Sequence, residues 1–278
     1  MGILSAGGGV GGTLGLLVIP LMAERWGWRI GYTLTLLPVL LTLALIALLL
    51  GERDAGSGSG QLRARRGPTG GLQALGSLGA LRQVLTARAI WPFNLTMLLF
   101  YGSYFSLVTW MPTFLVRHLG ATQSQAGLVT SLMVAGSIVS WPLAGLLTDR
   151  LGRRKPGVLF SQASSCLVSL AFAWVVPGLS LGGAAVVALA TGIVVGGMLL
   201  PLLMAVELFP VELTGTAASV VNTFSFIGSL SIPVLLGHVV DLMGSFPAAF
   251  VAAGALQALG FVTACLARET GTSAKRPI

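Results

Sequence analysis

The charged segment between two apolar stretches near the middle of the chain has the residue types of a latch. It runs from Gly145 to Lys155 and places one carboxylate, Asp149, among several basic side chains. A carboxylate at a helix end can accept charge-assisted hydrogen bonds from arginines in the following turn or from a neighbouring helix end. Glycines in such a segment permit a close approach or a tight turn. The residues of this predicted cytoplasmic gating loop are Gly145, Asp149, Arg150, Gly152, Arg153 and Arg154.

The basic residues of this segment have a second interpretation. Lys and Arg near the ends of membrane spans fix topology, because they are retained on the cytoplasmic side. On this interpretation Arg150, Arg153, Arg154 and Lys155 are only a stop signal, and no latch forms.

Polar side chains inside the apolar stretches are candidates for contact with a solute, because polar groups within a membrane are rare and mostly functional. Helical spacing puts Tyr101 and Tyr104 on one face, with Asn94 two turns before Tyr101. We predict that this face turns toward a cavity. The alternative is that such groups bond to neighbouring helices and only hold the bundle together. The cavity candidates are Asn94, Tyr101, Tyr104, Trp110, Asn222 and Thr223.

The ionisable residues lie near the ends of the apolar stretches rather than at their centres, where a proton carrier would lie. Glu207 and Pro210 form a predicted inner gate. His238 precedes Asp241 by one helical turn near an outer end, which predicts either an outer proton relay or an ordinary interfacial pair. No cluster of His, Cys or carboxylates has the spacing of a metal site or a catalytic centre. We therefore expect no metal, no cofactor and no enzyme activity.

These residues must be positioned by membrane spans. The chain is 55% hydrophobic and 9% charged, with a mean hydropathy of +0.91, so it has too few charges to cover a soluble globule. The net charge of +8 does not indicate nucleic acid binding, because the basic residues lie between apolar stretches. About 20 apolar residues cross a bilayer core. Eight stretches predict an all-α polytopic bundle in the lipid bilayer: 3–22, 31–50, 90–116, 127–147, 157–176, 181–206, 215–237 and 246–267.

The basic residues also predict the orientation. With a cytoplasmic N-terminus, only Arg25, Arg29 and Arg117 of the sixteen basic residues lie outside. Both termini are therefore expected in the cytoplasm of a multi-pass protein of the plasma (inner) membrane. The long connection contains a flexible Gly/Ser run, then basic residues, then helical spacing over 78–88. It divides the chain into a two-span part (1–50), a cytoplasmic linker (51–89), a six-span unit (90–267) and a cytoplasmic tail (268–278).

The pattern from Gly145 to Lys155 resembles the signature loop of the major facilitator superfamily, which occurs once in each six-helix half of that family. Gly27-Trp28-Arg29 resembles the turn between the family's fifth and sixth helices, and the basic linker its central loop. Glu207-Leu-Phe-Pro210 is similar to the start of its eleventh helix. The eight spans are thus similar to helices five to twelve, with a complete C-terminal half.

One departure from the family concerns the inner gate. The family usually carries a basic residue a few positions after the Glu-x-x-Pro element, where this chain has Glu212-Leu213-Thr214. That difference argues against a charge network at this gate.

The resemblance implies secondary active transport of a small solute, alone or with a coupling proton or ion, by symport or antiport. In alternating access two six-helix halves rock around a central site. Because the family's helices one to four have no counterpart, we expect a fragment of a longer reading frame, or a partner subunit that supplies the missing helices. The alternative is a membrane-bound half-transporter that binds or regulates another protein without transporting.

Overall fold

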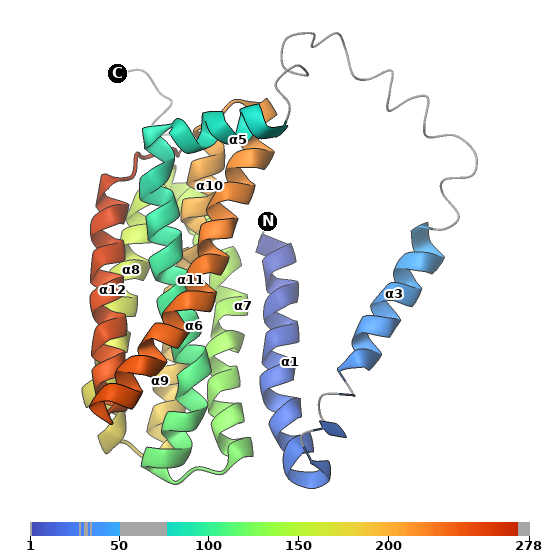
Figure 1. The fold of residues 1–278 in the computed structure, drawn as a ribbon, viewed down its shortest axis with the longest axis vertical. Helices are drawn as coiled ribbons and strands as arrows, with labels where there is room; N and C mark the ends of the chain where they lie inside the picture. Colours follow the sequence, from blue (N-terminus) through green and yellow to red (C-terminus); the bar gives the residue numbers. More distant parts are fainter. Residues whose placement is uncertain (1, 28, 31–32, 34, 51–76, 272–278) are drawn as a thin grey trace.

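The structure, a computed structural model, describes residues 2–27, 29–30, 33, 35–50 and 77–271. Every regular element in these ranges is helical, which confirms the all-α prediction (Figure 1). The α-helices are α1 (Gly2–Trp26), α3 (Leu36–Leu50), α5 (Ser77–Thr86), α6 (Trp91–Leu119), α7 (Gln123–Leu151), α8 (Lys155–Trp174), α9 (Leu181–Val194), α10 (Leu200–Glu207), α11 (Thr214–Met243) and α12 (Phe246–Leu266). Short 3-10 turns are η1 (Arg88–Ile90), η2 (Val176–Gly178), η3 (Val195–Leu199) and η4 (Val211–Leu213).

Six helical segments among the described residues are long and apolar enough to cross a membrane. They are Arg88–Leu119, Gln123–Leu151, Lys155–Trp174, Leu181–Glu207, Val211–Met243 and Phe246–Leu266. These segments coincide with the six spans predicted between 90 and 267, and we call them the six-helix unit. The helix α1 covers the first predicted span, and α3 covers most of the second. The helical spacing predicted at 78–88 corresponds to α5 and η1, whereas the rest of the linker and the tail beyond 271 lie outside the described residues.

Helices of the six-helix unit cross closely at glycines. A Cβ atom at Gly228 of α11 would overlap the carbonyl oxygen of Leu98 in α6. A Cβ atom at Gly192 of α9 would likewise overlap the carbonyl oxygen of Met133 in α7. Without side chains at these points the two backbones pack directly on each other, as membrane helices do at small residues.

The predicted span 181–206 is not one continuous α-helix, because η3 separates α9 from α10. The N–H of Gly197 in η3 donates to Ser161 Oγ of α8 at 2.8 Å, so a neighbouring helix satisfies it. Pro201, in the first turn of α10, has no backbone N–H and so cannot donate a hydrogen bond to a carbonyl oxygen of η3. The polar backbone of the break is therefore compensated by the protein, as the low-dielectric membrane interior requires.

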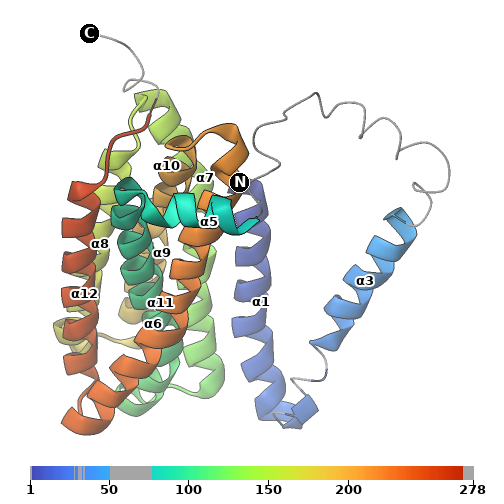
Figure 2. The same ribbon diagram turned by 45° about the horizontal axis from the view of Figure 1, so that its top comes forward.

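The helix α1 pairs with α7 and lies alongside it in both ribbon views, whereas α3 stands apart from the six-helix unit (Figures 1 and 2). Gly127 of α7 makes the pairing close, since a Cβ there would lie 2.6 Å from the carbonyl oxygen of Leu16. At the end of the pairing, the carboxylate of Glu24 accepts hydrogen bonds from the N–H of Ser124, at 2.8 Å, and from its hydroxyl.

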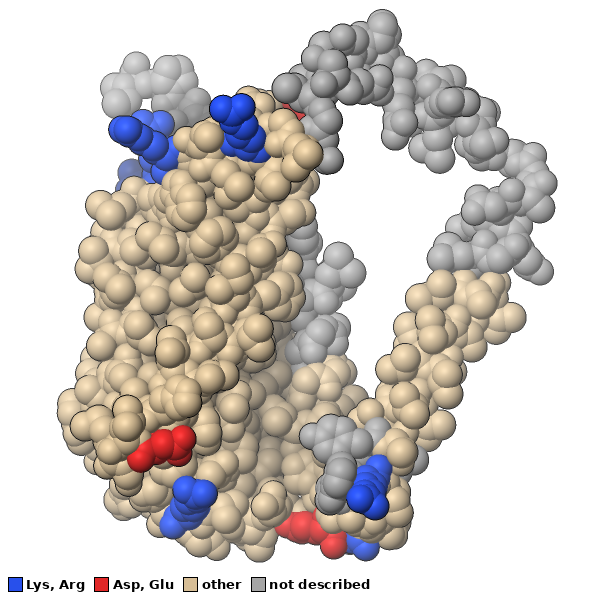
Figure 3. Space-filling view, viewed as in Figure 1, with Lys and Arg blue, Asp and Glu red and all other residues tan. Residues whose placement is uncertain are grey.

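On the face shown in Figure 3, the charged side chains of the described residues lie toward the two ends of the molecule, with a broad uncharged band between them. One end carries the loop between α7 and α8, and we call it the loop end. The other end carries the loop between α6 and α7, and we call it the Ser124 end. There Thr122 caps α7: its hydroxyl accepts from the N–H of Gln125, whose side chain accepts from the N–H of Thr122.

Candidate gating site at the loop end of the six-helix unit

The turn after α7 is set by a glycine in a left-handed conformation. Gly152 has a φ of +64° and donates its N–H to the carbonyl oxygen of Asp149 at 3.2 Å. This conformation is rarely adopted by residues with a side chain. The turn brings the start of α8 back toward the end of α7, so that Arg154 can reach Asp149.

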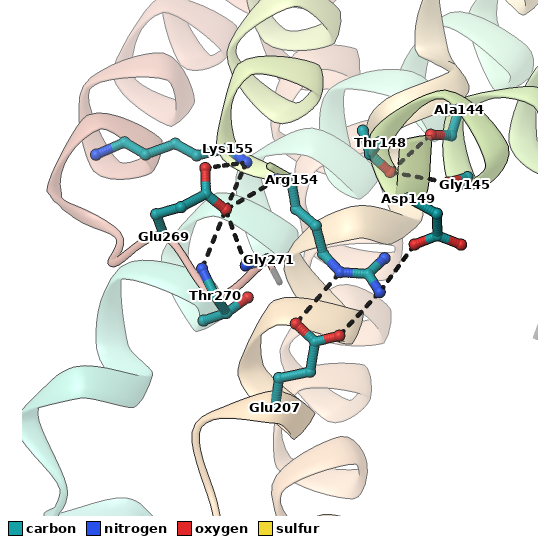
Figure 4. Close-up of polar contacts among 10 residues, drawn as sticks. All are labelled: Ala144, Gly145, Thr148, Asp149, Arg154, Lys155, Glu207, Glu269, Thr270 and Gly271. Atoms are coloured by element: carbon teal, nitrogen blue, oxygen red, sulfur yellow. Dashed lines mark hydrogen bonds and ion pairs between the residues drawn. The ribbon is translucent and has the colours of Figure 1, made fainter. Parts of the chain in front are cut away.

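Arg154 is the centre of the observed charge cluster (Figure 4). Its guanidinium holds the Glu207 carboxylate at the end of α10 through two contacts, Nη2 to Oε1 at 2.8 Å and Nε to Oε2 at 3.2 Å. It also pairs with Asp149 at 3.2 Å. The Arg154 side chain is 16% exposed and that of Glu207 is 27% exposed, so the bidentate pair is partly shielded from water. The cluster thus ties the ends of α7 and α10 to the start of α8.

Glu269, beyond the end of α12, is a second member of this site that the sequence did not single out. Its carboxylate accepts from the backbone N–H of Arg154 at 2.8 Å and of Lys155 at 3.1 Å, as well as from Thr270 and Gly271. Partial burial raises the pKa of this carboxyl, but the hydrogen bonds from Arg154, Gly271, Lys155 and Thr270 outweigh it, and the pKa is lowered. A carboxylate here also faces the positive end of the α8 dipole.

Lys155 joins the site from the opposite direction. Its ammonium donates to the carbonyl oxygen of Cys265, in the last turn of α12, at 2.6 Å. Carbonyls in the last turn of a helix have no partner within the helix, and a cation there also complements the helix dipole. Glu269 and Lys155 together therefore bind the end of α12 to the beginning of α8.

The other members of the predicted gating loop do not join this cluster. Arg150 and Arg153 are exposed, and neither makes an ion pair within the described part of the chain. A Cβ atom at Gly145 would meet no other atom of the described residues within 4 Å, so the close approach expected there stays a prediction. Only the tight turn at Gly152 is observed.

The predicted inner gate gains its cation from another loop. The lack of a basic residue after Pro210 argued against a charge network at Glu207, but Arg154, 53 residues earlier, supplies the missing positive charge. Pro210 itself is the N-cap residue of the turn η4, and its carbonyl oxygen accepts from the N–H of Leu213 at 2.9 Å. The expectation of no network was wrong because the partner lies close in space and far along the chain.

The cavity candidates on α6 lie at different degrees of burial. Asn94 is fully buried, and its amide has no hydrogen-bond partner among the described residues. Tyr104 is buried, and Tyr101 is half-buried with its ring stacked on Phe105. These degrees of burial alone do not show contact with a solute, which stays a prediction.

The remaining candidates do not extend this face. Trp110 donates its indole N–H to the carbonyl oxygen of Pro233 at 2.9 Å, and its ring lies against Gly237 of α11. That contact matches the alternative in which polar groups hold helices together. Asn222 and Thr223 are exposed on α11, where Thr223 donates to the carbonyl oxygen of Ser219. The structure does not bring the six candidates into one cluster.

The proposed relay pair at the Ser124 end is exposed. No hydrogen bond or ion pair joins His238 to Asp241 in the described residues, so a relay there stays a prediction. Within the same residues no group of three or more His, Cys, Asp or Glu side chains has a geometry that would hold a metal ion.

Comparison with known proteins agrees with a transporter fold. The sequence pattern of the Major Facilitator Superfamily matches residues 1–120 and 112–278. The chain is 23% identical over 262 residues to a nitrite extrusion protein of Bacillus subtilis, covering 94% of this chain and 61% of that protein. In an alignment 312 positions long it is 23% identical to the hexuronate transporter of the same organism, and the match covers 100% of this chain and 68% of that protein.

A third relative is the probable galactarate/D-glucarate transporter GudP of Bacillus subtilis, 27% identical over 190 residues, which are 63% of this chain and 39% of that protein. The chain therefore spans only part of the length of these relatives. Its helical bundle, its uncharged membrane band and the family match agree with one another. The chain belongs to the major facilitator superfamily, a family of membrane transporters and not of enzymes.

Proposed function

We propose that this chain forms part of a secondary active transporter that moves a small solute by alternating access. The observation that carries the proposal is the bonded loop end: Arg154 and Glu269 join α7, α8, α10 and the end of α12. Such bonds make the six-helix unit a body that can move as a whole, which rocking of one half against another requires. The loop residues Asp149 and Arg154, with Glu207, hold this body together at its predicted cytoplasmic face.

The pairing of α1 with α7 is the proposed moving contact. By its similarity to helix five of the family, α1 belongs to the other half of the transporter. Glu24 bonds to Ser124 at one end of this pairing. We infer that this conformation is closed at the Ser124 end, and that the bond breaks when the site opens to that side.

The proposed solute is a small anion. The relatives are named for nitrite, hexuronate and galactarate/D-glucarate, all of which are anions at neutral pH. A cation is needed to offset the cost of bringing an anion into a membrane site. The basic residues of the described six-helix unit lie near the ends of its spans, so we propose that residues outside this unit supply the cation.

The test is uptake into liposomes by the full-length product of the reading frame, with labelled glucuronate, galactarate and nitrite and with or without a pH gradient. We expect uptake of at least one of the three above that of empty liposomes. We expect Arg154→Gln to reduce it and Arg88→Gln, an exposed arginine at the same end that has no ion pair in the described residues, to leave it unchanged. A folded protein that moves none of the three would contradict the anion proposal, and one that moves no solute while binding another membrane protein would favour the non-transporting alternative.

A further inference from the structure

A groove opens on the surface of the six-helix unit, and none of its lining residues belongs to the charge cluster around Arg154. Its volume is about 410 Å³. The helices α7 and α8 form its walls, and η3 forms its floor, because Gly196 lies against Ser140 of α7 and Gly197 lies against Gly157 of α8. The groove therefore lies between two spans that the broken helix holds together from behind.

The walls of the groove are apolar and open to the surroundings. Leu143, Leu147, Leu151, Phe160 and Ile193 line it and each is about half or more exposed. The three hydroxyls of its lining are bonded within the protein: Ser140 donates to the carbonyl oxygen of Gly192 at 2.7 Å, Thr148 donates to that of Ala144 at 2.8 Å, and Ser161 accepts from the N–H of Gly197 at 2.8 Å. Such a surface favours a hydrocarbon chain over a polar solute.

The length of the groove matches one leaflet of a bilayer. Its lining on α7 extends from Ser140 to Leu151, which is about 16 Å of helix at the usual rise per residue. The hydrocarbon core of one leaflet is about 15 Å thick, half of the whole core. An acyl chain whose headgroup lies at the level of Leu151 would end near the break at η3.

Two arginines lie close in sequence to the loop end of the groove. Arg150 precedes Leu151, and Arg153 lies in the turn that leads to Pro156; Leu151 and Pro156 both line the groove. Both arginines are exposed and have no ion pair in the described residues. Two carboxylates of the loop end are already committed, since Asp149 is paired with Arg154 and Glu269 is bonded to backbone N–H groups. The two arginines have no such partner and are available to a phosphate.

From these observations we propose that the groove binds one anionic phospholipid, with an acyl chain between α7 and α8 and its phosphate held by Arg150 and Arg153. Basic pockets between spans are a known form of headgroup recognition. The proposal does not depend on the transported solute. Arg150 and Arg153 do not join the charge cluster, and the proposal gives them a role at the membrane surface.

The test measures bound lipid on the purified full-length chain by native mass spectrometry, with phosphatidylglycerol and phosphatidylcholine of the same acyl chains. We expect a preference for phosphatidylglycerol that falls by about five-fold for each of Arg150→Gln and Arg153→Gln. Arg88→Gln, which removes an exposed charge at the same end, is the matched control and should keep the preference. Leu147→Trp, which fills the groove, should reduce binding of both lipids.

Three outcomes would overturn the proposal. The first is equal binding of the two lipids by the unmodified protein. The second is an unchanged preference in a variant that carries both Arg150→Gln and Arg153→Gln and has a melting temperature like that of the parent. The third is displacement of the lipid by millimolar inorganic phosphate with no effect of Leu147→Trp, which would identify a site for a free anion rather than a lipid.

Discussion

The two ends of α7 are held in different ways. At the loop end, Arg154 and Glu269 connect α7, α8, α10 and the end of α12, all within the six-helix unit. At the Ser124 end, the carboxylate of Glu24 connects α7 to α1, which lies outside that unit. Bonds of the first kind persist when the unit moves as a body, and a bond of the second kind must break. We infer that the charged loop is a clamp inside one moving body and that the Glu24 contact is a gate between two.

The comparison requires a rigid unit, and the largest expected effect comes from breaking its closest helix crossing. In Gly228→Ala the new methyl group overlaps the backbone of Leu98, so α6 and α11 must separate. We expect a loss of about 3 kcal/mol in the free energy of unfolding, measured by denaturation in detergent. Gly145→Ala is the control, since nothing lies within 4 Å of its Cβ position, and a helical alanine there should be neutral or stabilising. Equal losses in the two variants would contradict the crossing as the source of rigidity.

The second prediction separates the clamp from its neighbours in sequence. Arg154→Gln leaves the partly buried Glu207 without its cation, and we expect a loss of about 2 kcal/mol, between the values for exposed and buried pairs. Arg153→Gln removes an exposed arginine without a described partner and should change the free energy of unfolding by less than about 0.5 kcal/mol. Thermal unfolding in one detergent measures both variants. Similar losses would mean that the loop acts through its total charge, as the stop-signal interpretation holds.

The spans were predictable from the sequence, whereas the choice among the arginines was not. A run of apolar residues reports its membrane location directly. Arg150, Arg153 and Arg154 are equivalent in composition, and only the left-handed turn at Gly152 and the position of Glu207 select Arg154. Those features depend on how three helix ends meet, which spacing along one chain does not encode.

Two other differences have similar causes. The donors to Glu269 are all backbone N–H groups, which every residue except proline carries. The residue types around Glu269 therefore do not predict that its carboxylate is bonded. The cavity candidates were chosen by residue type and shared face. The rotation of each helix then decides their surroundings, and it turns Trp110 onto α11 while leaving Asn222 exposed.

The third prediction tests the part of the clamp made by Glu269. Its pKa is lowered in the folded protein, so its contribution is present above the ordinary value of 4.5 and is lost as the pH falls through the folded value. We expect Glu269→Gln to lower the free energy of unfolding by about 1 kcal/mol at pH 7, the typical value for a helix cap. The gap between variant and parent should narrow in thermal unfolding measurements as the pH falls from 4.5 through the lowered pKa of the folded protein. A gap that is independent of pH would show that packing, and not the charge, provides the stabilisation.

The smallest effect on stability, and the sharpest test of the comparison, is expected for Glu24→Gln. Hydrogen bonds from the hydroxyl and N–H of Ser124 lower the pKa of this exposed carboxyl, so the bond holds above pH 4.5 and weakens as the pH falls below that value. Spin labels at Trp26 and Gln123, both exposed, would report the separation of α1 and α7 at this end. In Glu24→Gln we expect a longer or broader distance distribution at neutral pH, which the parent reaches only in acid. Arg154→Gln should leave this distribution unchanged, because its bonds lie within one body. If Arg154→Gln also separates the labels, the two ends are coupled and the division into clamp and gate is wrong.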